Sequence, residues 1–118
     1  MSGDSTISNK SKAFAIRIVN MARYLQKEKC EYVLSKQILK SGTSIGANVR
    51  ESKNAESKPD FIHKLEIALK ESDETEYWLE ILHETDYISD AIFDSMITDN
   101  KELTALLTSI IKTTKSNK

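Results

Sequence analysis

Two carboxylate-histidine pairs offer the most recognisable candidate chemistry in the sequence. Asp60 lies three residues before His63, and Glu80 lies three residues before His83. Di-iron helical bundles take one such pair from each of two facing helices to hold their metal ions. Here both pairs fall in one predicted helix, where a rise of about 1.5 Å per residue separates the histidines by about 30 Å. Because the chain has 2 histidines in all, we expect no metal site and no cofactor.

Signatures of nucleophilic catalysis and of nucleotide binding are missing from the sequence. It has no glycine-rich loop after a strand, no nucleophile elbow and no zinc-ligand spacing. Ser41, Thr43 and Ser44 lie together, but no histidine near them in sequence could act as a base. The single cysteine, Cys30, has no neighbour in sequence that would activate its thiolate. We therefore predict a protein without enzymatic activity and without a small-molecule substrate.

Small residues dominate the segment from residue 35 to residue 54. Gly42 and Gly46 lie four residues apart in a predicted helix, where each glycine costs about 1 kcal/mol relative to alanine. A close approach of another backbone would offset that cost. Asn48 and Glu51 are expected to be buried and to bond to another subunit or to the following helix, at Glu71, Ser72 or Thr75. The predicted packing or oligomer surface consists of Gly42, Ile45, Gly46, Asn48, Val49 and Glu51.

Apolar residues recur at helical spacing and predict four helices. The first covers residues 11–29, and the second covers residues 35–54 with Ser35 as its expected N-cap. Ahead of them, residues 1–10 are polar and serine-rich. We therefore expect a disordered N-terminal tail.

The third predicted helix has the clearest start signal, a capping box at residues 57–60 with a proline in the first turn. After a short turn, the fourth helix begins with Ser89 as its expected N-cap and extends to about residue 115. Asp99 starts another capping pattern inside this helix. That pattern predicts a kink near Asn100.

Four amphipathic helices joined by short links predict an all-α fold, an antiparallel up-down four-helix bundle. One domain at residues 11–115 is expected, because a chain of 118 residues suits a single core. No apolar run approaches the length of about 20 residues that a membrane span needs. The single cysteine suits a reducing compartment. We therefore expect a cytoplasmic protein without a membrane partner.

Two stretches carry a resemblance to a known family, ILKSGTSIGANVRES and KPDFIHKLEIALKESDETEYWLEIL. They resemble the small four-helix-bundle proteins encoded by intervening sequences within bacterial 23S ribosomal RNA genes. The most specific residues of the match are Thr43, Ser44, Ile45, Asn48 and Glu51, followed by Tyr77, Trp78 and Leu79. The match covers roughly residues 14–111. One departure is Ser52, which stands where the family often has glycine and suggests a different exit from the second helix.

The resemblance implies a four-helix bundle and, less directly, an assembly. The family is similar to accessory proteins of diversity-generating retroelements, which form five-membered rings and bind nucleic acid and a reverse transcriptase. It therefore implies a homo-oligomer, with a pentamer as the suggested count, and RNA as a candidate partner. No catalytic residue is carried over.

Charge is distributed unevenly along the chain, although the formal net charge is −1. Residues 1–70 contain 13 basic and 7 acidic residues, whereas residues 71–118 contain 4 basic and 11 acidic residues. This asymmetry is typical of solvated faces, or of complementary surfaces between subunits. The preferred hypothesis is a non-enzymatic, homo-oligomeric interaction module, and the alternative is an RNA-binding accessory protein. RNA contacts are then expected from basic residues of the first two predicted helices, namely Arg17, Arg23, Lys27, Lys36, Lys40, Arg50 and Lys53.

Overall fold

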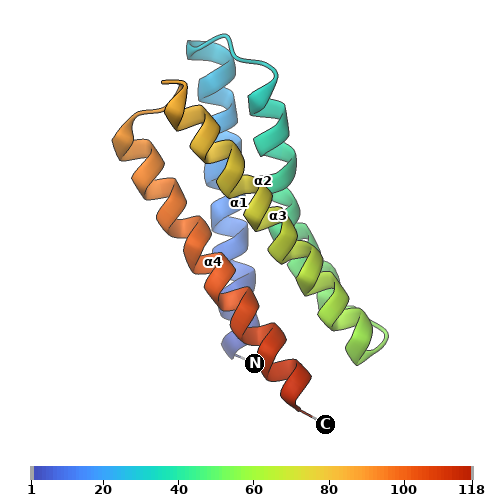
Figure 1. Cartoon of the computed structure of the whole chain (residues 1–118). Helices are drawn as coiled ribbons and strands as arrows, with labels where there is room; N and C mark the ends of the chain where they lie inside the picture. Colours follow the sequence, from blue (N-terminus) through green and yellow to red (C-terminus); the bar gives the residue numbers. More distant parts are fainter. Residues whose placement is uncertain (1, 118) are drawn as a thin grey trace.

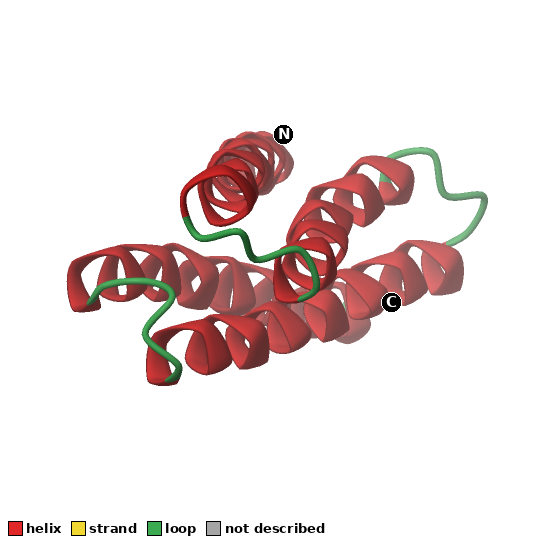
Figure 2. Ribbon diagram, turned by 90° about the horizontal axis from the view of Figure 1, so that it is seen from above, coloured by secondary structure: helices red, strands yellow, loops and turns green. Residues whose placement is uncertain are grey.

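The computed structural model describes the backbone of residues 2–117 and the side chains of residues 6–117. It contains four helices, α1 (Ser2–Glu28), α2 (Leu34–Ser52), α3 (Lys58–Glu84) and α4 (Asp90–Ser116). Each helix runs antiparallel to the next, so the predicted all-α up-down bundle is confirmed (Figure 1). The described residues outside the helices form three short links and the end of the chain (Figure 2).

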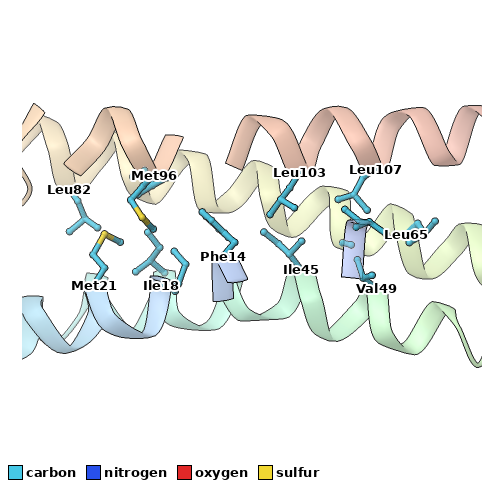
Figure 3. Packing of buried hydrophobic residues seen from close by; sticks show 14 of the residues in the cluster. Phe14, Ile18, Met21, Ile45, Val49, Leu65, Leu82, Met96, Leu103 and Leu107 are labelled. Carbon is cyan, nitrogen blue, oxygen red and sulfur yellow. The ribbon is translucent and has the colours of Figure 1, made fainter. Parts of the chain in front are cut away.

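The bundle is elongated, with extents of 49 × 22 × 20 Å. We call the end with the α1-α2 and α3-α4 links the link end. The opposite end carries both termini and the α2-α3 link, and we call it the termini end (Figure 1). Apolar side chains from all four helices meet along the axis between these ends (Figure 3), among them Phe14, Ile18, Ile45, Leu65, Leu82, Leu103 and Leu107.

The start of α1 differs from the disordered tail that we expected over residues 1–10. The helix begins at Ser2, and Ile7 belongs to the core with 3% of its surface exposed. Ile7, Ser11, Phe14 and Ile18 follow a helical spacing, and all four are buried. Although this segment is mostly polar, the buried face of α1 therefore continues into it as far as Ile7.

Three of the helix starts show how side chains satisfy backbone N–H groups. Ser57 Oγ accepts from Asp60 N at 3.1 Å, and Ser89 Oγ accepts from Ile92 N at 3.2 Å, so these two predicted N-caps are confirmed. Ser35, the expected N-cap of α2, instead lies inside the helix and is fully buried. The carboxylate of Glu31 takes its place, because it accepts from the backbone N–H groups of Val33, Leu34 and Ser35 at 2.7–3.1 Å.

The interruption that we predicted near Asn100 does not occur, since α4 is one continuous helix from Asp90 to Ser116. Asn100 is fully buried, and its Nδ2 donates to the backbone O of Ser72 in α3 at 2.8 Å. The residue therefore belongs to the α3-α4 packing and does not cap a new helix. Its polarity, taken as a helix break, reflects a hydrogen bond across the core.

Candidate functional site

Gly42 and Gly46 lie where α2 meets α1. A Cβ atom added at Gly42 would lie 2.7 Å from Cγ1 of Ile18, and two more Ile18 carbons would be 2.9 Å away. A Cβ atom at Gly46 would lie 3.3 Å from the backbone O of Ser11. Gly42 therefore admits a buried α1 side chain, and Gly46 admits the α1 backbone itself.

Ile45 and Val49 continue this face and are buried in the core, with 0% and 2% of their surfaces exposed. Asn48 is half-buried, and its Nδ2 donates to the backbone O of Ser44 within its own helix at 2.9 Å. Glu51 is exposed, which corrects the expectation that it would be buried. Helix geometry explains both differences, because positions 48 and 51 lie beside the buried stripe that Ile45 and Val49 form on α2.

The buried polar contacts between helices come from other residues. Thr75 Oγ1 in α3 lies 2.9 Å from Ser41 Oγ in α2, and Ser72 Oγ in α3 lies 2.7 Å from Thr104 Oγ1 in α4. Ser72 and Thr75 occupy positions in the apolar stripe of α3. Polar residues at positions where the pattern predicts apolar ones are the sequence signal for these buried polar contacts. With Asn100, these hydroxyl groups fix the register of three helices in their middle.

The two histidines lie near opposite ends of α3. His83 Nε2 is 2.6 Å from Asp90 Oδ1, and its ring stacks on Phe93 at a centroid distance of 4.2 Å. His63 is exposed near the other end of α3. Within the part of the chain that the structure describes, no three potential metal-ligand side chains form a cluster.

The seven basic residues proposed for RNA contact do not form one surface. Arg17 faces α4, where its Nη1 binds Oδ2 of Asp99 and its Nη2 donates to Ser95 Oγ at 2.8 Å. The six others are exposed on α1, on α2 and just after α2, at Arg23, Lys27, Lys36, Lys40, Arg50 and Lys53. Arg17 is therefore occupied within the bundle, while the remaining six are available to a partner.

Two of these exposed residues line a groove of about 500 Å³ between α1 and α2 at the termini end. Arg50 and Lys53 come from the end of α2, and Lys12 comes from α1. Small residues at Ala15 and Ala47 leave space between these long side chains. Sequence reasoning missed Lys12, because its proximity to Arg50 and Lys53 depends on how α1 packs against α2.

Two acidic residues have shifted pKa values that report on their surroundings. Burial would raise the pKa of Glu31, but its hydrogen bonds from the α2 backbone outweigh burial and lower it from the ordinary value of 4.5. Burial raises the pKa of Glu71 in α3, and the neighbouring Glu74 raises it further against the opposing charge of Lys40. Glu31 is thus held as a charged cap, whereas Glu71 marks a crowded acidic stretch of α3.

Among the described residues, no helix is long and apolar enough to cross a membrane.

The family model described as 23S rRNA-intervening sequence protein matches residues 3–109. A search of curated proteins found no match.

A solved structure also resembles the chain, a crystal structure of a protein with unknown function from the S23 ribosomal protein family of Bacteroides thetaiotaomicron. The two sequences are 55% identical, the match covers 93% of this chain and 98% of that chain, and the TM-score is 0.92. Both comparisons agree with the family resemblance that the sequence motifs indicated. The chain therefore belongs to the family of 23S rRNA-intervening sequence proteins.

Proposed function

We propose that the chain is a non-enzymatic helical module that assembles with copies of itself through its link end. The observation that carries the proposal is the separation of opposite charges on two edges of that end. The α1-α2 edge carries exposed basic residues, which are Arg23, Lys27, Lys36 and Lys40. The α3-α4 edge carries exposed acidic residues, which are Asp73, Glu74, Glu84, Asp86, Asp90 and Asp94.

Exposed apolar side chains at the same end support a contact there. Val33 and Tyr32 in the α1-α2 link are 70% and 54% exposed, and Tyr77 in α3 is 54% exposed. Tyrosine is enriched at protein interfaces because it combines apolar area with a polar group. Oppositely charged edges beside such residues favour a head-to-tail contact, which closes into a ring when the rotation between subunits permits. A pentamer is the count suggested by the family resemblance.

Light scattering of the purified protein at micromolar concentration tests this proposal. The native chain should have a mass several times 13.4 kDa, and Lys27→Glu combined with Lys36→Glu should reduce it by placing like charges in the contact. Adding Glu84→Lys and Asp94→Lys to that variant should restore the assembly. Lys101→Glu combined with Lys112→Glu, at exposed α4 positions away from the link end, is the matched control. A native monomer would contradict the proposal.

Direct RNA binding is the second candidate function, favoured by the six exposed basic residues that have no ion-pair partner among the described residues. Four such residues engaged with single-stranded phosphates would give a log-log salt slope of about −3, at about −0.7 per phosphate. The assay titrates the assembled protein with a labelled ribosomal RNA fragment at two salt concentrations. Salt-sensitive binding that Arg50→Glu abolishes would favour this function. The absence of binding at low salt would remove it.

We also propose a cytoplasmic location. The one cysteine, Cys30, is free and exposed, and free thiols persist in reducing compartments. Neither proposal requires a cofactor. The two proposals share Arg23, Lys27, Lys36 and Lys40, whereas Arg50 and Lys53 lie at the other end of α2 and stay available to RNA in the assembly.

A further inference from the structure

We propose that the groove between α1 and α2 at the termini end is a binding site for phosphate groups. This inference goes beyond self-assembly, which we place at the link end, and it deepens the proposed RNA contact, with which it shares Arg50 and Lys53. It adds a chemical class of ligand that the bundle holds at a defined place.

The groove has the size of a ligand site. Its volume of about 500 Å³ falls within the range of roughly 300–1,000 Å³ that small-molecule sites occupy in proteins. Its walls come from two helices that are fixed against each other by the contact between Gly46 and the backbone of Ser11. A site built on two closely packed helices keeps its shape without a ligand.

Three cations line this groove, and none of them forms an ion pair with a residue that the structure describes. Lys12, Arg50 and Lys53 are all exposed, and no described carboxylate lies within ion-pair distance of any of them. Other exposed basic residues, such as Lys101 and Lys112, also lack an ion-pair partner among the described residues, but in the groove three such residues line one hollow. The groove therefore concentrates unneutralised positive charge.

The one carboxylate that lines the groove is directed to another partner. Glu51 Oε1 lies 3.2 Å from Lys64 Nζ, which belongs to α3 and does not line the groove. That pair reduces the repulsion between Glu51 and a bound anion. Glu51 therefore leaves the positive charge of the groove largely intact.

A hydroxyl group without a partner gives the second, independent observation. Ser8 lines the groove, and its Oγ is buried with no hydrogen-bond partner among the described residues. A buried donor without an acceptor is unfavourable by about 1–3 kcal/mol. A phosphate oxygen in the groove would supply that acceptor after rotation about the Ser8 χ1 bond.

Helix electrostatics alone do not account for this arrangement. Arg50 lies in the last turn of α2 and Lys53 follows its end, where any cation interacts favourably with the helix dipole. That effect is confined to the last turn of the same helix. It gives no reason for Lys12, which approaches the groove from α1, so the convergence of the three cations points to an anion between them.

Phosphate is the anion that fits this combination of groups. Arginine binds phosphate through two parallel hydrogen bonds, and lysine binds it as a point charge. Both a free diphosphate and a nucleic acid strand present this group. The two sources differ in what else they contact, so the experiment uses one probe of each kind.

Isothermal titration calorimetry with pyrophosphate and with a short oligouridylate, at constant ionic strength, tests the site. Arg50→Gln and Lys12→Gln should each weaken binding about tenfold, the usual loss for a charge-assisted hydrogen bond. Lys101→Gln is the matched control, because it removes one exposed, unpaired charge from α4 and should leave the affinity unchanged. Glutamine keeps the helix propensity of lysine and arginine, so all three variants should fold. Ser8→Ala should weaken binding several-fold.

The two probes separate the sources of phosphate. Groove-dependent binding of both assigns the site to phosphate groups in general, and groove-dependent binding of the oligouridylate alone assigns it to the nucleic acid backbone. Equal loss in Arg50→Gln and Lys101→Gln would show diffuse attraction and would overturn the proposal. Failure of both probes to bind would also overturn the proposal. If Arg50→Gln then changes the mass of the assembly, the groove holds an acidic segment of another copy instead of phosphate. Loss of self-assembly in the link-end variants leaves this site untouched, so the two proposals fail separately.

Discussion

Helix α1 contacts its two neighbours in different ways. Against α2, the glycines allow contact at the level of the backbone, with Ile18 seated over Gly42 and Ser11 over Gly46. Against α4, two exposed ion pairs span the helices, from Lys10 to Glu102 and from Arg17 to Asp99, with side chains that are 40–50% exposed. The first contact consists of closely packed atoms, and the second consists of exposed charged groups.

The two contacts also differ in the free energy that they contribute. Exposed ion pairs contribute about 0–1 kcal/mol, whereas burial of a large aliphatic side chain contributes roughly 1.5–3 kcal/mol. We therefore expect α1 to be held on the bundle mainly by α2, with α4 as the weaker side where the structure opens first.

Gly42→Leu should have the largest effect of any substitution in this comparison. Even a Cβ atom would lie within 2.9 Å of three Ile18 carbons, and Ile18 is fully buried. Overpacking of this kind costs about 3 kcal/mol, and the helix propensity gained over glycine, about 1 kcal/mol, offsets part of it. Urea unfolding followed by circular dichroism measures the change.

Gly46→Ala is the control for this prediction. Its Cβ would lie 3.3 Å from Ser11 O, a distance that a small shift of the two backbones relieves, so gain and loss should nearly cancel. Gly46→Leu, by contrast, should be destabilising because the longer side chain cannot avoid the α1 backbone. Equal stability of Gly42→Leu and the parent would show that α1 does not depend on the glycine contact.

Ile7→Ala tests whether the first turns of α1 belong to the bundle. Ile7 is 3% exposed and lies beside Val49, Phe61, Leu65 and Ile110, from the three other helices. Its truncation should destabilise the protein by about 2 kcal/mol, the lower end of the range for buried aliphatic residues, because the site is near a helix end. Thermal unfolding and limited proteolysis measure this. A stability equal to that of the parent would restore the disordered-tail interpretation.

The fold was largely predictable from the sequence because the apolar stripes of α2, α3 and α4 are long and regular. The failures have particular causes. Ile7 is a single apolar residue among polar ones, so the periodicity gives too little signal to extend α1. Asn100 resembles a helix break locally, and only the position of Ser72 on the facing helix makes it a core residue.

The candidate sites were less predictable than the fold. The glycine pair could be singled out because glycine inside a helix is unfavourable and demands an explanation. The groove could not be predicted, because it combines Lys12 with Arg50. These residues are 38 positions apart in sequence, and they come close only because α1 and α2 pack against each other. Glu31 shows a similar limit, since it caps a helix from a link whose backbone path, with Cys30 at φ 51°, the sequence does not specify.

Glu31→Gln probes the link that attaches α1 to α2. The carboxylate accepts three backbone N–H groups at the start of α2, where the helix dipole favours negative charge. The variant keeps an acceptor but loses the charge, so we expect a loss of about 1 kcal/mol at pH 7. Chemical denaturation at pH 7 measures this loss.

The same residue predicts a dependence on pH. Because the folded protein holds the pKa of Glu31 below 4.5, its ordinary value, the contribution of Glu31 to stability is present in full above pH 4.5. It is lost as the pH falls through the lowered pKa of the folded state. The stability gap between the parent and Glu31→Gln should therefore shrink with acidification, and a gap that stays constant down to pH 2 would contradict the assignment of Glu31 as a charged cap.

Asp99→Asn should have the smallest effect, and it tests the other flank of α1. The substitution removes the charge that pairs with Arg17 but keeps an oxygen that can accept from its guanidinium. Both side chains are about 40% exposed, so water replaces most of the lost interaction and the expected cost is at most about 0.5 kcal/mol. Because salt screens the exposed pair, parent and variant should become equally stable near 1 M sodium chloride. A loss above about 2 kcal/mol, or one that salt does not reduce, would mean that α4 holds α1 as firmly as α2 does and that the contrast between the two flanks is false.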